Sequence, residues 1–421
     1  MKANIKTNKI CRICSSSELI FVFNLNPTAP ANALRKKSTN KFKLYPLSLN
    51  FCRKCKHLQL AHIVNPNILF SNYLYTSSAS NVYLNYLSEY VLHIIKRYNL
   101  DPKKHKICDI ASNDGSFLSF FKKNNFDVCG IEPAKNLSKI SSNKKIKTLN
   151  FFLKYQVIKK YKKLKNKFKI ITANHVFAHV ENLNDFFKSV DFLLAQDGIF
   201  IFEVGYLYSV IKNMHFDTVY HEHMDYHHFY PLNILCKINN YKIIFVEQTN
   251  TQGGSIRIHC TRKINSLEKV NKNSVFKIEK KEKKMKLNNY YTYINFAKII
   301  NKNKENFFKK VNKLNIFKKK IIGYGAPAKV TTFLSYYKFP DYSIKYIIDD
   351  SKFKHDLFLP SNNIQIKKFS ILKKEDFDFV IIFAWNFKDS IIKKLKTLNK
   401  DFTIIVPFPK TKFIKIQNEN K

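Results

Sequence analysis

The chain has 421 residues, of which 45% are hydrophobic and 15% aromatic, so it can build about two or three globular domains. This composition excludes wholesale disorder. Its longest apolar runs, such as IFIFEV and FVIIFAW, are far shorter than the roughly 18–20 residues that cross a bilayer, and the chain opens MKANIKTNKICRIC without an apolar segment. We therefore expect a soluble cytoplasmic protein without a membrane partner.

The formal net charge of +44 would suit a nucleic-acid partner. Only six of the 74 basic residues are arginine, however, and lysines are spread along the whole chain beside abundant Asn and Ile. Base recognition prefers the forked guanidinium of arginine. Since Lys, Asn and Ile all have A/T-rich codons, we interpret the charge as compositional bias on solvated surfaces and expect no nucleic-acid partner. The charge would still attract a substrate that carries a diphosphate.

Two pairs of cysteines near the N-terminus predict a metal site. Cys11 and Cys14 form C-R-I-C, and Cys52 and Cys55 form C-R-K-C after a 37-residue gap. The two-residue spacer lets both sulfurs of a tight turn face one ion, so the four thiolates predict one structural Zn²⁺ per chain. Disulfides are the alternative, but no signal peptide is apparent. The other cysteines stand in apolar contexts and are expected in the core: Cys108, Cys129, Cys236 and Cys260.

The remaining chain alternates predicted strands and helices. Residues 1–72 are predicted to form the zinc-binding module. Residues 73–264 form a doubly wound α/β unit, with strands at KICDIAS, FDVCGIEP, FKIITANHV and GIFIFEV and an antiparallel pair at YKIIFVEQT and SIRIHCTR. A long amphipathic helical connector is predicted over residues 265–318, and a second, Rossmann-like α/β unit over residues 319–421.

The turn after the first predicted strand is typical of a cofactor site. The sequence ICDIASNDGSFL places Asn113, Asp114 and Gly115 where the chain enters a helix, whose N-terminus can hold polar ligands. The second strand ends at Glu132, where a carboxylate can accept from both hydroxyls of a ribose. This resembles the S-adenosylmethionine-binding half of a class I methyltransferase more than a nicotinamide site, which would carry G-x-G-x-x-G. An ordinary strand-turn-helix without a ligand is the alternative.

Polar residues also follow the fourth strand and the segment after the fifth. TANHVFAHV places Asn174, His175 and His179 at the carboxyl edge of the sheet, where open α/β sheets bind ligands. FDTVYHEHMDYHHF then holds the densest group of titratable residues in the chain. Its spacing lacks the H-E-x-x-H of zinc enzymes and favours general acid–base chemistry. A polar loop without function is the alternative.

Within this segment a histidine would act as base, Glu222 would orient it, and a tyrosine hydroxyl would donate to a developing oxyanion. His221 and His223 share a face if the segment is extended, so spacing alone does not choose between them. His227 and His228 are expected to face solvent.

Together these motifs resemble the sugar C-methyltransferases, which methylate a ring carbon of a nucleotide-linked keto-sugar. The resemblance follows the chain in order through YPLSLNFCRKC, LFSNYLYTSS, DIASNDGSFL, GIEPAKN, ITANHVFAHV, FDTVYHEH, TQGGSIR, IIGYGAPAK and FAWNF. It implies a zinc-binding N-terminal domain, a central class I methyltransferase domain and a Rossmann-like C-terminal domain that encloses the sugar nucleotide. Ala111 stands where the family more often has glycine.

The resemblance also implies roles for single residues. Asn113, Asp114 and Glu132 would hold the methyl donor. The residues that would face the sugar are Tyr75, Asn174, His179, Tyr220, Glu222 and His223. We also assign Gly115 and Asn174 to the donor site and His175 to the substrate. The resemblance favours His223 as the base.

The C-terminal turn GYGAPAK carries Gly323, Gly325 and Lys329. We expect it to contact the diphosphate of the sugar nucleotide; a second cofactor site and a purely structural remnant are the alternatives.

The expected reaction is therefore S-adenosylmethionine-dependent C-methylation of a nucleotide-linked keto-deoxysugar, in which loss of the proton beside the ketone gives an enolate. Two other functions stay open, an RNA methyltransferase with a zinc ribbon and a non-catalytic interaction protein stapled by zinc. The scarcity of arginine counts against the first. The histidine–carboxylate cluster beside a donor turn counts against the second.

Overall fold

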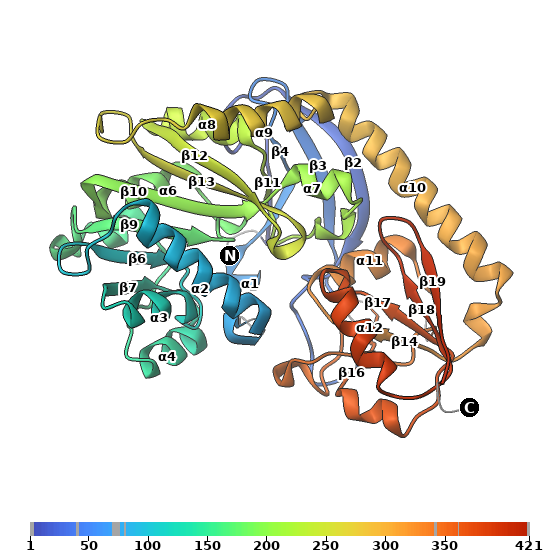
Figure 1. The fold of residues 1–421 in the computed structure, drawn as a ribbon. Helices are drawn as coiled ribbons and strands as arrows, with labels where there is room; N and C mark the ends of the chain where they lie inside the picture. The colour runs from blue at the N-terminus through green and yellow to red at the C-terminus, as the bar shows by residue number, and fades with distance from the viewer. Residues whose placement is uncertain are drawn as a thin grey trace.

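The computed structural model describes residues 4–38, 42–69, 76–79, 81–340, 343–360 and 362–418. Within these residues the chain forms sheets of two, four, seven and six strands (Figure 1). The two-stranded sheet pairs β1 (Ile5–Thr7) with β5 (His62–Val64). Among the described helices, not one has the length and apolar character needed to cross a membrane.

The N-terminal sheet is antiparallel and has the strand order β11-β4-β3-β2. Its strands are β2 (Leu19–Thr28), β3 (Tyr45–Cys52), β4 (Leu58–Leu60) and β11 (Asp225–Tyr226). Alternate side chains of β3, among them Leu47, Leu49 and Phe51, are buried on one face, as expected of a strand that covers a core on one side. The edge strand β11 comes from the histidine-rich segment much later in the chain.

The seven-stranded sheet has the order β12-β13-β10-β9-β6-β7-β8. Its strands are β6 (Lys106–Ile110), β7 (Asp127–Ile131), β8 (Lys147–Leu149), β9 (Phe168–Asn174), β10 (Leu194–Gly205), β12 (Tyr241–Thr249) and β13 (Ser255–Arg262). All are parallel except β13, which pairs antiparallel with both β10 and β12. The strand order reverses between β6 and β9, and such a switch point opens a crevice at the carboxyl ends of the strands. The expected doubly wound sheet and its antiparallel pair are thus confirmed.

Helices accompany this sheet along the chain. They are α2 (Asn81–Arg97), α3 (Ser116–Lys123), α4 (Lys135–Asn143), α5 (Tyr155–Ile158), α6 (Leu183–Leu193), α7 (Leu207–Lys212) and α8 (Phe229–Ile238). The strands β6, β7 and β9 are buried along most of their length, as is usual for parallel strands with both faces covered.

The connector consists of two helices, α9 (Lys272–Met285) and α10 (Tyr290–Lys313), rather than one. The chain leaves α9 through Lys286, whose φ of 55° is left-handed, and Asn289 caps α10 by accepting a hydrogen bond from the backbone of Tyr291. Figure 1 shows α10 running from the N-terminal sheet along the outside of the molecule to the C-terminal unit.

The C-terminal unit has a six-stranded sheet in the order β16-β15-β14-β17-β18-β19. The strands are β14 (Ile321–Tyr324), β15 (Ile347–Ile348), β16 (Ile366–Lys367), β17 (Phe379–Ile382), β18 (Phe402–Val406) and β19 (Lys412–Ile416). Only β19 is antiparallel. Its helices are α11 (Lys329–Tyr337) and α12 (Lys388–Lys396). The order reverses between β14 and β17, which confirms the Rossmann-like expectation.

The N-terminal sheet packs between the two α/β units. Leu47 and Phe51 belong to the same hydrophobic core as Phe307 of α10 and Phe333 of α11. The cysteines of the two C-x₂-C turns instead join the core of the seven-stranded sheet. The only described hydrophobic cluster that belongs to this module alone is small, formed by Tyr45, Val64 and Leu69 with Ile5, so the module packs mainly against the two larger units and connects them.

Candidate active site

The four predicted zinc ligands meet in one cluster, with their sulfur atoms within 4.8 Å of one another. The Sγ atoms of Cys11 and Cys55 are 3.4 Å apart, and those of Cys14 and Cys52 are 3.7 Å apart. A tetrahedral zinc with Zn–S bonds of about 2.3 Å separates its sulfurs by about 3.8 Å, whereas a disulfide bond is about 2.05 Å long. The cluster thus fits zinc and excludes disulfides. As expected, the other four cysteines are free and buried.

Glu132 lies at the carboxyl end of β7 and is only 4% exposed. Its Oε2 accepts a hydrogen bond from the backbone N–H of Asn113 (2.8 Å), and its Oε1 accepts one from Ala134 (2.8 Å). Burial raises the pKa of this carboxyl, and the two N–H donors oppose that shift. A carboxylate has about four lone-pair sites, so two remain for ribose hydroxyls.

The donor turn itself is folded through left-handed residues. Ala111 and Asn113 have φ values of 54° and 53°, a conformation that costs free energy for any residue but glycine. Gly115 has φ 74°, and a Cβ atom there would lie 2.4 Å from Ser141 Oγ. Gly115 is therefore required by the turn, which it shapes without bordering the cavity.

Asp114 is fully buried beneath this turn. Its carboxylate accepts hydrogen bonds from the backbone N–H groups of Ser78 (3.0 Å) and Ser116 (3.1 Å), and Lys144 lies 3.5 Å away. Asn113 holds the neighbouring Ser77 N–H in the same way at 3.0 Å. Asp114 therefore stabilises the turn, while Glu132 and Asn113 border the cavity.

Asn174 and His175 extend the site from the end of β9. Both polar atoms of the Asn174 side chain are buried without a hydrogen-bond partner, a state that costs roughly 1–3 kcal/mol unless a ligand relieves it. His175 has φ 57°, and its Nε2 lies 3.3 Å from the buried carboxylate of Glu203. This unpaired amide lines the same cavity as Glu132, so the donor crevice fits a polar ligand.

Tyr220, His223 and His179 form one contact group across the cavity. Nε2 of His223 and the hydroxyl of Tyr220 are 2.9 Å apart, and the His179 and His223 ring centroids are 5.1 Å apart. His223 Nδ1 lies 2.9 Å from the carbonyl oxygen of Thr218. Because a carbonyl only accepts, the neutral ring carries its proton on Nδ1, and Nε2 accepts from Tyr220.

Both histidines of this group are held neutral. Burial lowers the pKa of His223 well below its usual 6.5, and His179 adds to the effect. Burial likewise lowers the pKa of His179 to about 4. Its Nδ1 donates to the backbone carbonyl of Glu222 at 2.7 Å, so its lone pair is on Nε2. A neutral imidazole is the form that can accept a proton.

The Glu222 side chain contacts Asn32 rather than a histidine. Asn32 Nδ2 donates to both carboxylate oxygens, at 2.7 and 2.9 Å. Burial raises the pKa of Glu222 to about 7, against the lowering effect of Asn32. Glu222 orients His179 through its backbone carbonyl, and its carboxyl is poised to exchange a proton near neutral pH.

The structure separates His221 from His223. His221 is fully buried, and its Nε2 lies 3.3 Å from the carbonyl oxygens of Tyr45 and Pro46, away from the cavity. The expectation that His227 and His228 face solvent is wrong. Both are buried because β11 pairs with β4 and draws the following residues inward. His228 donates to Asn288 (3.0 Å), and His227 stacks on His57.

The C-terminal glycine turn brings Lys329 to the other end of the cavity. Its Nζ is 3.1 Å from Asn386 Oδ1 and 3.2 Å from the centre of the Trp385 ring. Trp385 Nε1 donates to Asp217 at 2.7 Å, so the second unit touches the segment just before Tyr220. Burial lowers the pKa of Lys329 to about 7, opposed by Asp217. The predicted site residue Tyr75 lies outside the described residues.

One cavity of about 1820 Å³ joins these groups. Its lining includes Glu132 and Asn174, Tyr220 and His223, and Lys329. Ordinary ligand pockets hold roughly 300–1,000 Å³, so this one has room for two ligands side by side. Sequence reasoning gave no role to Asn32, Asp217 or Trp385. Asp217 and Trp385 lie inside the motifs FDTVYHEH and FAWNF, but their contact joins segments that are distant in the chain, and Asn32 lies outside the quoted motifs.

Three family models match the chain in order. They are described as "Putative zinc binding domain" over residues 11–70, "Methyltransferase domain" over residues 83–244 and "C-methyltransferase C-terminal domain" over residues 250–409. The chain is also 25% identical over 411 residues to the C-methyltransferase NovU of Streptomyces niveus. The aligned region covers 97% of each chain.

Solved structures with partial likeness include the PH0226 protein of Pyrococcus horikoshii OT3, at 14% identity and a TM-score of 0.37, covering 45% of this chain and 94% of that one. Magnesium protoporphyrin IX methyltransferase (ChlM) of Synechocystis PCC 6803, with bound S-adenosylmethionine, is 14% identical with a TM-score of 0.32, covering 42% and 79%.

The sheet order, the donor turn and the methyltransferase match define an S-adenosylmethionine-dependent methyltransferase of class I. The three matches, in one order from residue 11 to residue 409, are to a zinc-binding domain, a methyltransferase domain and a C-methyltransferase C-terminal domain, so the chain is similar to C-methyltransferases over nearly its whole length. The predicted similarity to C-methyltransferases, the methyl donor and the structural zinc are thereby confirmed.

Proposed function

We propose that this C-methyltransferase methylates a ring carbon beside the ketone of a nucleotide-linked keto-deoxysugar, in the cytoplasm. The observation that carries the proposal is the hydrogen-bonded Tyr220–His223 pair, with its neutral histidine, in a cavity that is also lined by Glu132 and Asn174 of the donor crevice and by Lys329. Carbon beside a ketone becomes nucleophilic only after losing a proton, and a histidine–tyrosine pair is suited to remove it.

In this reaction the C–H bond beside the ketone breaks and its proton ends on Nε2 of His223, directly or through the Tyr220 hydroxyl that now occupies that nitrogen. Tyr220 then donates to the enolate oxygen, which bears the developing charge. His179 and Glu222 border the same space and position the sugar. When bound, S-adenosylmethionine supplies the electrophilic methyl group that the enolate carbon takes up.

Lys329 and Asn386 would hold the diphosphate of the nucleotide. A lysine ammonium is a strong point charge for phosphate, and the wide cavity leaves room for the nucleotide beyond the sugar. The C-methyltransferase matches favour this reaction over the RNA methyltransferase and the non-catalytic protein that the sequence left open.

Proton exchange tests the proposal without methyl transfer. The enzyme is incubated in D₂O with a nucleotide-linked 4-keto sugar and no methyl donor, and loss of the α-proton is followed by NMR. Wild-type enzyme should exchange this proton, and addition of S-adenosylmethionine should yield a product with a new C–CH₃ group. If several nucleotide-linked keto-sugars are tested and the enzyme neither exchanges the α-proton nor methylates any of them, the proposal is contradicted.

A further inference from the structure

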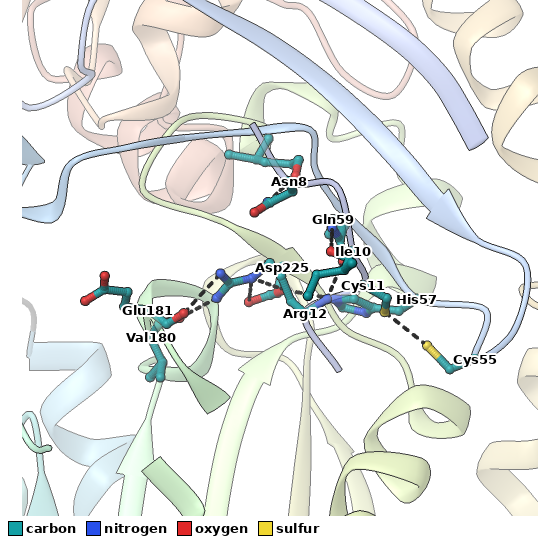
Figure 2. A network of polar contacts seen from close by, with 11 residues as sticks. Asn8, Ile10, Cys11, Arg12, Cys55, His57, Gln59, Val180, Glu181 and Asp225 are labelled. Carbon is teal, nitrogen blue, oxygen red and sulfur yellow. Dashed lines mark hydrogen bonds and ion pairs between the residues drawn. The ribbon is translucent and has the colours of Figure 1, made fainter. Parts of the chain in front are cut away.

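Arg12 lies inside the first C-x₂-C turn, yet its side chain reaches both segments that carry the active-site histidines (Figure 2). Its Nε donates to both carboxylate oxygens of Asp225, at 2.9 and 3.0 Å. Its Nη1 donates to the carbonyl oxygen of Glu181 at 3.2 Å, and Nη2 donates to that of Val180. Asp225 follows His223 by two residues, and Val180 follows His179 directly. The guanidinium therefore bridges the two histidine segments.

The position of Arg12 is itself set by the zinc-binding module. Its backbone N–H donates to Gln59 Oε1 at 2.8 Å, and Gln59 stands opposite Asp225 in the β4–β11 pairing. His57 Nε2 donates to Asp225 at 2.8 Å. The Arg12 side chain is 7% exposed and that of Asp225 is fully buried, so this ion pair is well shielded from solvent. Cys11 and Cys14 flank the arginine and tie it to the metal.

A second set of contacts holds the same segments without Arg12. The backbone N–H of Leu60 donates to Met224 O at 2.9 Å, and the N–H of Met224 donates to Ala178 O at 2.7 Å. These bonds tie β4 to the start of β11 and to the turn before His179. Because neither bond involves Arg12, we expect a replacement of Arg12 to shift the histidines rather than unfold the module.

We infer that Arg12 is a positioning residue, which transmits the geometry of the zinc site to the His179–His223 pair. Proton transfer needs heavy atoms within about 2.6–3.2 Å of each other, and a misplacement of about 1 Å can cost roughly 10²-fold in rate. The metal would then act as a template for the active site as well as a staple for its own module. The inference rests on the proposed function only in its kinetic test, because that test measures the proposed reaction.

The matched control is Arg53, the arginine at the same place in the second C-x₂-C turn, whose side chain is exposed. Arg12→Gln, Arg12→Lys and Arg53→Gln are compared with wild type for zinc per chain, kcat, KM and the histidine ring resonances of protein labelled with ¹³C-histidine. The His223 resonance is assigned with His223→Gln.

Arg12→Gln should keep one zinc per chain, lower kcat by roughly 10–100-fold as replaced supporting partners do, leave KM within about threefold and shift the His223 resonance. Arg12→Lys should recover little of the kcat, because an ammonium lacks the planar fork that serves three acceptors. Arg53→Gln should match wild type in every measurement.

Several outcomes would overturn the inference. One is a wild-type kcat and an unmoved His223 resonance in Arg12→Gln. A raised KM at unchanged kcat would make Arg12 a substrate contact. If Arg12→Gln loses zinc, Arg12→Lys decides the question. A zinc-replete Arg12→Lys with the wild-type kcat would show that only the positive charge at this position matters, for structure, and not the guanidinium geometry. The NMR comparison needs no substrate, so it decides this point even if the keto-sugar reaction fails.

Discussion

The two α/β units carry the same carboxylate arrangement at the ends of corresponding strands. In the central unit, Glu132 accepts from the residue two positions on and from Asn113 in the turn after the neighbouring strand. In the C-terminal unit, Asp349 accepts from Ser351, two positions on, at 2.9 Å, and from Ala326, in the turn after the neighbouring strand, at 2.7 Å. Both carboxylates border the one large cavity.

The units differ in what surrounds these carboxylates. In the central unit the cavity is lined by the neutral rings of His179 and His223 and by the unpaired amide of Asn174, which suit proton transfer and a polar donor. Near Asp349 it is lined by Lys354, which lies 3.5 Å away, and by Lys329. The comparison shows that the same backbone arrangement at the strand ends can support either catalysis or anion binding, depending on the few side chains that surround it.

The largest effect is expected where the zinc site joins the two units. A Cys52→Ser, Cys55→Ser double variant should lose its one zinc per chain and a large part of its stability, since structural zinc contributes on the order of 10 kcal/mol in small modules. Both units should loosen together, because the module packs against each. Elemental analysis and thermal unfolding measure this. Stoichiometric zinc in the double variant would place the ligands elsewhere.

His223→Ala tests whether the chemistry belongs to the central unit. It should lower both α-proton exchange and methyl transfer by roughly 10²–10⁴-fold, the usual loss for a general base. Tyr220→Phe should slow both less. His221→Gln is the matched control and should retain most activity, because His221 faces Tyr45 and Pro46. Exchange that survives in His223→Ala and disappears in His221→Gln would reverse the assignment.

Glu132→Ala and Asp349→Ala compare the two carboxylates directly. Loss of hydrogen bonds to a charged acceptor costs about 1.5–3 kcal/mol each, so Glu132→Ala should weaken S-adenosylmethionine binding at least tenfold in calorimetry. Asp349→Ala should leave that affinity within about twofold. An unchanged affinity in Glu132→Ala would contradict the assignment of this carboxylate, and a loss of affinity confined to Asp349→Ala would place the donor site in the C-terminal unit.

The smallest effects are expected in the pH profiles, which should differ between the units. His223 must be neutral to act, and its pKa is lowered, so kcat should stay level from pH 8 to 6.5 and fall only at lower pH. Lys329 must be charged to hold a diphosphate, so kcat/KM should decline as pH rises past about 7, by up to tenfold per unit. A kcat that already falls above pH 6.5, or a level kcat/KM to pH 9, would contradict these assignments.

The sequence predicted those features that arise from local pattern. Buried strands appear as mainly apolar runs, and their polar ends mark the cavity edge, which located Glu132 and Asn174 by position. His223 was favoured over His221 only through the family resemblance. Contacts between distant segments have no local signal. Asn32 reaches Glu222 across 190 residues, and Trp385 reaches Asp217 across 168. The two residues of β11 are too few to be recognised as a strand, which is why His227 and His228 were expected at the surface.

The edge strand β11 also imposes an order on folding during synthesis. Both cysteine pairs are complete once residue 55 has been made, but Asp225 lies 168 residues after His57, to which it bonds. At about 5–20 residues per second this separation amounts to roughly 10–30 seconds. Until then β4 presents unpaired backbone groups, the kind of edge that pairs with other chains. Nascent or truncated chains that end before β11 are thus the forms of this protein most prone to aggregate.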